Sequence, residues 1–262
     1  MKIFVAGATG NVGSCITKSI MQGSKYELVG GFCSETGMDI GEAAGLKSSG
    51  LYCIADLGFA LHKSSPDIAI DFTSARVIMD NIKIYAREKV NAVIGTTGFD
   101  EAMMEETRDL AKGSGIRLAI ISNFGMGMNF VMEFIRKVRA YYPYASIMDR
   151  HRADMANAPS GTAVTLAENA REGESGTTKS QEVIPHVLGG NLGGVQITSQ
   201  RLPYPGPYSE HEITLGRPDE IIRITVQDFS SEVYLPGVFL AVDNLGTFPP
   251  GSVVTSLSEF NK

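Results

Sequence analysis

The N-terminal segment contains the feature that most limits how this chain can fold. Residues 2–7 form a short β-prone run that ends in Gly7, and residues 11–23 carry apolar side chains at helical spacing. Gly7, Gly10 and Gly13 lie between these segments in a G-x-x-G-x-x-G pattern. Glycines allow the backbone to approach a pyrophosphate, whose negative charge the N-terminus of a helix favours. The pattern predicts a dinucleotide-binding turn, with an ordinary tight turn as the alternative.

Strands and helices continue to alternate through the first half of the chain. The strands are nearly apolar throughout, which is typical of a parallel sheet covered by helices on both faces. The expected strands are 26–32, 67–73, 91–98 and 116–123, and the expected helices are 77–89 and 101–115. The alternation predicts an N-terminal Rossmann domain of the α/β class.

The pattern changes after about residue 130. Helices are expected at 130–142 and from residue 160 onward, and residues 237–245 are also helix-like. The strand-like segments are 145–150, 193–202, 209–216 and 221–230. Short turns between the last of these predict a central α+β domain with a mainly antiparallel sheet. Residues 172–182 read as a flexible, solvated loop.

Composition narrows the classes of function. The chain has 262 residues, 43% of them hydrophobic, and a net charge of −6. This charge provides no basic surface for a phosphate backbone, so we expect small-molecule ligands and no nucleic acid partner. The N-terminal apolar run is too short for a signal peptide and no later run has membrane-spanning length, so we expect a cytoplasmic protein without a membrane partner.

The chain contains three cysteines, Cys15, Cys33 and Cys53. Their number is odd and their spacing does not fit a metal site. We therefore expect buried free thiols and no bound metal.

Three polar loops follow expected strands, at the edge of a parallel sheet where ligands bind. Ordinary turns would explain one such loop but explain all three less well. With the glycine turn, they provide these candidate cofactor-binding residues: Gly7, Thr9, Gly10, Asn11, Val12, Gly13, Ser34, Phe72, Thr73, Gly95, Thr96, Thr97, Ser122, Asn123 and Phe124.

The end of the second strand bears on the choice of cofactor. NAD-binding Rossmann domains usually carry an acid there, which binds the ribose 2′-hydroxyl. Here Cys33 and Ser34 occupy that place, and Glu35 comes one or two residues later. Repulsion of a 2′-phosphate should be reduced, although no Arg or Lys lies nearby to bind it. We expect NADPH to bind at least as well as NADH.

Residues 149–163, DRHRADMANAPSGTA, combine a histidine, two arginines and a helix start. Gly161 and Thr162 could present backbone N–H groups to a carboxylate, although Ser160 could also be a plain helix cap. His151 has the right ordinary pKa for proton transfer near neutrality, but a lone histidine is often structural. Arg152 could bind a carboxylate bidentately.

Three further residues carry similar alternatives. Arg201, on an expected strand, is a second possible carboxylate ligand or a solvated surface residue. His211 and Glu210 begin another strand and could be purely structural.

Several motifs together resemble the dihydrodipicolinate reductase family. In chain order they are VAGATGNVG, IDFT, VIGTTGF, SNFGMGMNF, APSGTA, SQR and EHEITL. The resemblance implies hydride transfer from NADH or NADPH to a cyclic unsaturated carboxylate. It also implies a dinucleotide-binding domain formed by 1–127 and 236–262, and a substrate-binding domain, 128–235, whose sheet builds a homotetramer.

The resemblance assigns roles to individual residues. The family's nicotinamide loops correspond to Gly95, Thr96, Thr97, Asn123 and Phe124, and its substrate-carboxylate loop corresponds to Ser160, Gly161 and Thr162. His151 takes the place of a histidine that serves proton transfer, which makes it the expected catalytic residue. Arg152 and Arg201 complete the expected substrate-binding set.

The chain also departs from the family pattern. Arg152 replaces a second histidine, Met155 replaces a catalytic lysine, Asn157 replaces an aspartate, and Asn11 replaces an arginine of the glycine loop. We therefore expect an NAD(P)H-dependent reductase with an altered substrate. The alternatives are the ordinary family reaction, with another group replacing the lysine, and a non-catalytic nucleotide-binding descendant.

Overall fold

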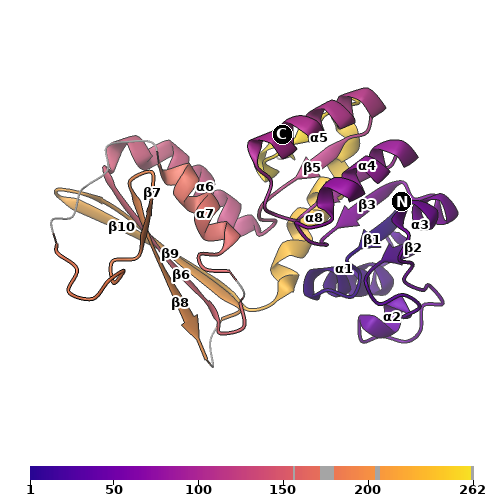
Figure 1. Cartoon of the computed structure of the whole chain (residues 1–262), viewed down its shortest axis with the longest axis horizontal. Helices are drawn as coiled ribbons and strands as arrows, with labels where there is room; N and C mark the ends of the chain where they lie inside the picture. The colour runs from indigo at the N-terminus through magenta and orange to yellow at the C-terminus, as the bar shows by residue number, and fades with distance from the viewer. Residues whose placement is uncertain (156, 172–179, 204–206, 261–262) are drawn as a thin grey trace. The chain divides into compact units, whose positions relative to one another are not determined.

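A computed structural model describes residues 1–155, 157–171, 180–203 and 207–260 (Figure 1). The chain divides into two compact units. The first is Met1–Gly125 with Tyr234–Lys262, and the second is Met126–Val233. Part of the expected solvated loop, residues 172–179, lies outside the described residues. None of the described helices is long and apolar enough to span a membrane.

The first unit contains a parallel sheet with the strand order β11-β5-β4-β3-β1-β2. Its strands are β1 (Lys2–Ala6), β2 (Glu27–Phe32), β3 (Ile68–Asp71), β4 (Asn91–Ile94), β5 (Leu118–Ile120) and β11 (Val253–Val254). Its helices are α1 (Asn11–Gln22), α2 (Ile40–Ala43), α3 (Leu57–Ser64), α4 (Ile78–Glu88), α5 (Glu101–Ser114) and α8 (Leu235–Asn244). The predicted Rossmann-like α/β fold is confirmed.

The alternation produces this sheet because the strands are apolar on both faces. Every residue of β3, β4 and β5 is buried except Asn91, which is half-buried. One large apolar cluster packs this sheet against α3, α4 and α5, with Leu61, Ile82 and Ala111 among its buried members. Burying each large aliphatic side chain contributes about 1.5 to 3 kcal/mol.

The second unit contains a five-stranded sheet with the strand order β10-β9-β6-β8-β7. Its strands are β6 (Tyr144–Arg152), β7 (Gly190–Leu192), β8 (Val195–Leu202), β9 (Ser209–Arg217) and β10 (Glu220–Asp228), and its helices are α6 (Met126–Val138) and α7 (Gly161–Ala170). All neighbouring strands are antiparallel except β6 and β8, which are parallel. The expected mainly antiparallel sheet is confirmed.

Some elements have no clear signal in the sequence. Helix α3 has only eight residues, and its start depends on Asp56, whose carboxylate accepts a hydrogen bond from the Phe59 N–H. Strand β11 has two residues and exists because Val253 and Val254 pair with β5. Short elements of this kind depend on tertiary contacts more than on local pattern.

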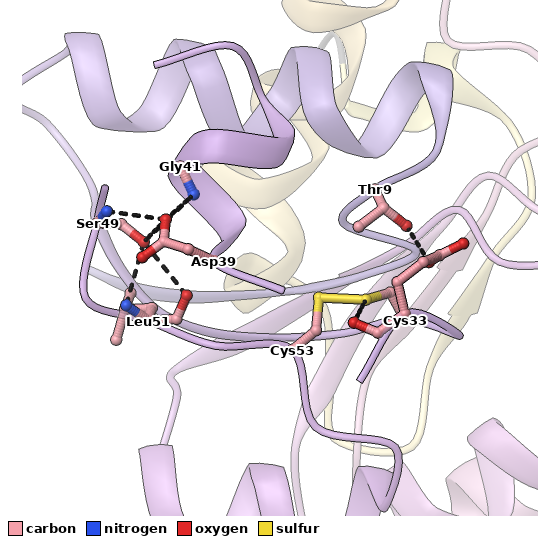
Figure 2. Close-up of a disulfide and its surroundings, with 8 residues drawn as sticks. Thr9, Cys33, Asp39, Gly41, Ser49, Leu51 and Cys53 are labelled. Atoms are coloured by element: carbon pink, nitrogen blue, oxygen red, sulfur yellow. Dashed lines mark hydrogen bonds between the residues drawn. A yellow bond between two sulfur atoms is a disulfide. The ribbon is translucent and has the colours of Figure 1, made fainter. Parts of the chain in front are cut away.

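The cysteines differ from the expectation of buried free thiols. Cys33 and Cys53 form a disulfide, with Cα atoms 5.7 Å apart, and Cys15 is half-buried and outside the disulfide (Figure 2). The two paired residues are 20 positions apart, and the loop after β2 returns to bring them together. Spacing alone could not reveal this pairing because neither cysteine belongs to a motif.

A thiol count tests the pairing. Protein unfolded without reductant should react with one equivalent of Ellman's reagent, at Cys15, and with three after reduction. The matched Cys15→Ser variant should show none before reduction. Since the disulfide closes a loop of about 20 residues, Cys53→Ser should lower the free energy of unfolding by about 3 kcal/mol. Three reactive thiols before reduction would contradict the pairing.

Candidate active site

The glycine turn of the first unit is packed too closely for side chains. Gly7 has φ of +79°, and a Cβ there would lie 2.5 Å from the carbonyl oxygen of Phe72. A Cβ on Gly13 would lie 2.0 Å from the carbonyl oxygen of Gly7. Helix α1 begins next to this turn with Gly10 as its N-cap and without a side-chain cap. Its first N–H groups are therefore available to an anion such as a dinucleotide pyrophosphate.

The remaining glycine-turn residues surround this helix start. Asn11 is exposed, and Val12 and Thr9 are half-buried. Asn11 is the first residue of α1.

The structure brings the loops after β3, β4 and β5 together at the carboxyl edge of the sheet. The rings of Phe72 and Phe124 have centroids 5.6 Å apart. A Cβ on Gly95 would lie only 2.1 Å from the Phe72 ring. Glycine at position 95 therefore lets an aromatic side chain lie directly against the β4 loop.

Other predicted loop residues have different surroundings. Thr96 is 8% exposed, and its Oγ1 atom has no hydrogen-bond partner among the described residues. Such a buried polar atom fits a site that is completed by a ligand. Thr97 and Ser122 are exposed, and the Asn123 side chain accepts a hydrogen bond from the Gly125 N–H.

Thr73 has a structural role that the sequence did not indicate. Its hydroxyl donates to the buried carboxylate of Asp71 at 2.6 Å. The same carboxylate accepts hydrogen bonds from Asn81 at 2.9 Å and Tyr85 at 2.8 Å. The Thr73 side chain therefore fixes the β3 loop.

Glu35 lies closer to the glycine turn than its place in the sequence suggested. Its carboxylate accepts a hydrogen bond from the hydroxyl of Thr9 at 2.7 Å. Hydrogen bonds from Thr9 and then Ser34 lower the pKa of Glu35, so this exposed carboxylate stays ionised. In a Rossmann domain the adenosine ribose binds beside this turn. The structure thus supplies an acid that the end of β2 lacks.

In the second unit, the alternation of β6 separates its polar side chains onto two faces. Asp149 and His151 are buried on the face that packs against the helices, while Arg150 and Arg152 are on the other. Arg152 forms an exposed ion pair with Asp154, with 2.8 Å between Nη2 and Oδ2. The structure therefore does not bring Arg152 together with His151.

Asp149 is the centre of a buried polar cluster, which we call the Asp149 cluster. Its carboxylate is completely buried and accepts hydrogen bonds from both the N–H and the Oγ of Ser160, at 3.0 and 2.8 Å. Ser199 Oγ donates at 3.0 Å, and Arg201 Nη2 donates at 3.2 Å. His151 Nδ1 lies 2.8 Å from Oδ1, although the ring is not aligned for a straight hydrogen bond.

His211 completes the Asp149 cluster. Its Nε2 atom lies 3.1 Å from Ser160 Oγ and 3.4 Å from Asp149 Oδ1. The His211 ring meets the His151 ring edge to face, with centroids 5.2 Å apart. Sequence reasoning left His211 as a structural candidate and did not consider Asp149. A charged residue at an inward-facing strand position was the one available signal.

The environment keeps Asp149 ionised. Burial would raise its pKa, but the polar contacts with His151, His211 and Ser160 outweigh this effect and hold the pKa well below its usual range. Donor atoms of Asp149, His151 and His211 are close enough together to hold a metal ion. However, the carboxylate already binds a guanidinium and several hydrogen-bond donors, which a cation would have to displace. We therefore interpret these residues as a hydrogen-bonded cluster.

The Asp149 cluster also determines what the predicted anion loop can offer. Ser160 is the N-cap of α7, and its Oγ accepts a hydrogen bond from the Ala163 N–H at 3.2 Å. Its hydroxyl is therefore committed to the protein. Gly161 is exposed and Thr162 is half-buried at the first turn of α7, where helix N–H groups favour an anion. Arg201 is mostly buried and bonded to Asp149, so it is not a solvated surface residue.

Comparisons with known proteins agree with this architecture. The family model described as dihydrodipicolinate reductase, N-terminus, matches residues 1–124, and the corresponding C-terminus model matches 127–259. A 4-hydroxy-tetrahydrodipicolinate reductase from Desulfitobacterium hafniense (strain DSM 10664 / DCB-2) is 32% identical over 248 residues, covering 92% of each chain. One from Carboxydothermus hydrogenoformans (strain ATCC BAA-161 / DSM 6008 / Z-2901) is 31% identical over 246 residues, also covering 92% of each.

Two solved structures share the fold. Dihydrodipicolinate reductase from Paenisporosarcina sp. TG-14, bound to dipicolinate, has a TM-score of 0.79 and 22% identity, and the match covers 99% of this chain and 98% of that one. An amine dehydrogenase from Mycobacterium smegmatis has a TM-score of 0.66 and 16% identity, with coverage of 97% and 94%.

Fold and relatives together define an NAD(P)H-dependent oxidoreductase with a Rossmann-like first unit. More specifically, the chain belongs to the dihydrodipicolinate reductase family, as its motifs predicted.

The position of Glu35 leads to a prediction opposite to the one drawn from the end of the second strand. A carboxylate beside the glycine turn should accept a hydrogen bond from a ribose hydroxyl and repel a 2′-phosphate. We expect NADH to bind more tightly than NADPH, and Glu35→Gln to improve NADPH binding relative to NADH by about tenfold. Isothermal titration with both cofactors measures this ratio. Thr97→Val, in the loop after β4, is the control and should leave the ratio of the two affinities unchanged. Equal ratios in the wild type and Glu35→Gln would contradict the role of Glu35.

Proposed function

We propose that this enzyme reduces a cyclic imine or a conjugated C=C bond in a heterocyclic carboxylate. The observation that carries the proposal is that His151 and the start of α7 share one buried carboxylate. A proton donor can serve the reduction of the unsaturated bond, and an anion-binding helix start can hold the carboxylate of the same molecule. The curated relatives, named 4-hydroxy-tetrahydrodipicolinate reductase, act on a ligand of this class.

The proposed roles follow from this geometry. When bound at the first unit, NAD(P)H supplies the hydride. The glycine turn and the uncapped start of α1 bind its pyrophosphate. The N–H groups of Gly161 and Thr162 bind a substrate carboxylate. His151 supplies the proton to the atom of the reduced bond that does not receive the hydride, directly or through a water that it orients.

Met155 is the reason to propose a changed substrate. It occupies the place of the family's lysine, is 38% exposed, and can neither donate a proton nor carry charge. Arg152 adds positive charge nearby, but Asp154 offsets part of it. Losing one contact to a charged partner costs about 1.5 to 3 kcal/mol, or one to two decades in kcat/KM. A dicarboxylate that needs that contact should therefore be a poor substrate.

The ordinary family reaction is the second candidate, and the names of the relatives favour it. In that case another group takes over the function of the missing lysine.

We further propose that the enzyme forms a homotetramer through the sheet of the second unit and acts in the cytoplasm. The homotetramer rests on the resemblance to the family.

Steady-state kinetics with 4-hydroxy-tetrahydrodipicolinate distinguish the two candidates. The wild type should reduce it slowly, and Met155→Lys should raise kcat/KM by about tenfold or more. Met155→Gln is a matched control of similar size that adds no positive charge and should bring little gain. A wild type that reduces it at the rate of its relatives, with no gain from lysine, would contradict the changed substrate and support the ordinary reaction.

A further inference from the structure

Two parts of the candidate site bind the same buried carboxylate. Asp149 Oδ1 lies 2.8 Å from His151 Nδ1 and 2.8 Å from Ser160 Oγ. Its other oxygen, Oδ2, accepts the backbone N–H of Ser160 at 3.0 Å. The histidine is near the end of β6, and the serine is the N-cap of α7. One side chain thus connects the proton donor to the helix start that would bind the substrate carboxylate.

The two ring nitrogens of His151 have different surroundings. Nδ1 faces Asp149, and the ring of His211 packs edge to face against it with a centroid separation of 5.2 Å. The side chain is 9% exposed. Nε2 has no hydrogen-bond partner among the described residues. Nε2 is therefore the ring nitrogen available for proton transfer.

We propose that Asp149 is a positioning residue, which orients His151 with Nε2 toward the substrate and holds the first turn of α7 beside it. This rests on the proposed function, because it takes His151 as the proton donor. An ionised carboxylate only accepts hydrogen bonds, so it favours the neutral imidazole with its proton on Nδ1. Nε2 is then the atom that takes up and gives away the exchanged proton.

The neighbours of Asp149 keep it ionised and fixed. Arg201 Nη2 at 3.2 Å provides a positive charge, and Ser199 Oγ at 3.0 Å binds the same oxygen. Asp149 itself is completely buried, so it is not in a position to touch a ligand. Its effect on catalysis must therefore pass through His151 and Ser160. A buried acceptor that fixes a histidine tautomer in this way has the same physical role as the aspartate of a serine protease triad.

The experiment compares Asp149→Asn, Asp149→Glu and His151→Gln with the wild type. Asparagine keeps the shape but can donate a hydrogen bond, so kcat should fall by about 10² to 10³-fold, close to the effect of His151→Gln. NADH affinity should stay within about twofold. Asp149→Glu restores an acceptor and should recover at least tenfold of the lost kcat. Asp39→Asn is the matched control, because Asp39 is another buried, multiply hydrogen-bonded carboxylate, in the first unit. It should reduce stability while kcat stays within about threefold.

A spectroscopic measurement separates positioning from structural support. Protein labelled with ¹⁵N at its four histidines reports which ring nitrogen carries the proton, and His151→Gln assigns the signal of interest. At a pH where the ring is neutral, wild-type His151 should be protonated on Nδ1. Asp149→Asn should shift this population toward Nε2.

Three results would overturn the proposal. They are a neutral wild-type His151 protonated on Nε2, an unchanged tautomer in Asp149→Asn, and an Asp149→Glu variant no better than Asp149→Asn. The wild-type tautomer does not depend on whether any variant folds. It is also independent of turnover. If no cyclic carboxylate is reduced by the wild type, the proposed function fails while the role of Asp149 is still decided by the ¹⁵N signal.

Discussion

The second unit depends on one buried negative charge. Moving a carboxylate out of water costs several kcal/mol unless the surrounding groups replace its hydration. At Asp149 the replacement comes from β6, β8, β9 and the start of α7 at once, through His151, Arg201, His211 and Ser160. Because these groups come from separate elements, satisfying the charge also sets how strands and helix meet. The requirement for stability and the geometry of the candidate site are thus the same constraint.

The first unit depends on the opposite kind of constraint, the absence of side chains. Cβ atoms at Gly7, Gly13 and Gly95 would lie 2.0 to 2.5 Å from neighbouring backbone or ring atoms. A side chain at Gly7 or Gly13 would clash with a backbone oxygen, which cannot move aside as the end of a flexible side chain can. These glycines let the turn, the start of α1 and the Phe72 ring pack closely at the edge of the sheet. The result is a surface where backbone N–H groups can reach a pyrophosphate.

The sequence allowed the fold to be predicted better than the site. Alternating apolar strands and helices are local patterns, so the Rossmann-like sheet and the mainly antiparallel second sheet could be recognised. The Asp149 cluster could not, because His211 is 62 positions from Asp149 and strand pairing alone brings them together. Glu35 was discounted for a similar reason, since the path of the loop carries its carboxylate back to Thr9. The disulfide of Cys33 and Cys53 is likewise a consequence of loop path.

The proposed function requires that hydride passes from NAD(P)H to a cyclic unsaturated carboxylate. Its most direct test is transfer of deuterium from NADH or NADPH carrying two deuterium atoms at C4 to a series of cyclic imino and conjugated carboxylates, with the products analysed by mass spectrometry. The account predicts oxidation of the cofactor together with a product one mass unit heavier than that formed from unlabelled cofactor. Cofactor binding without deuterium transfer to any of these carboxylates would contradict it.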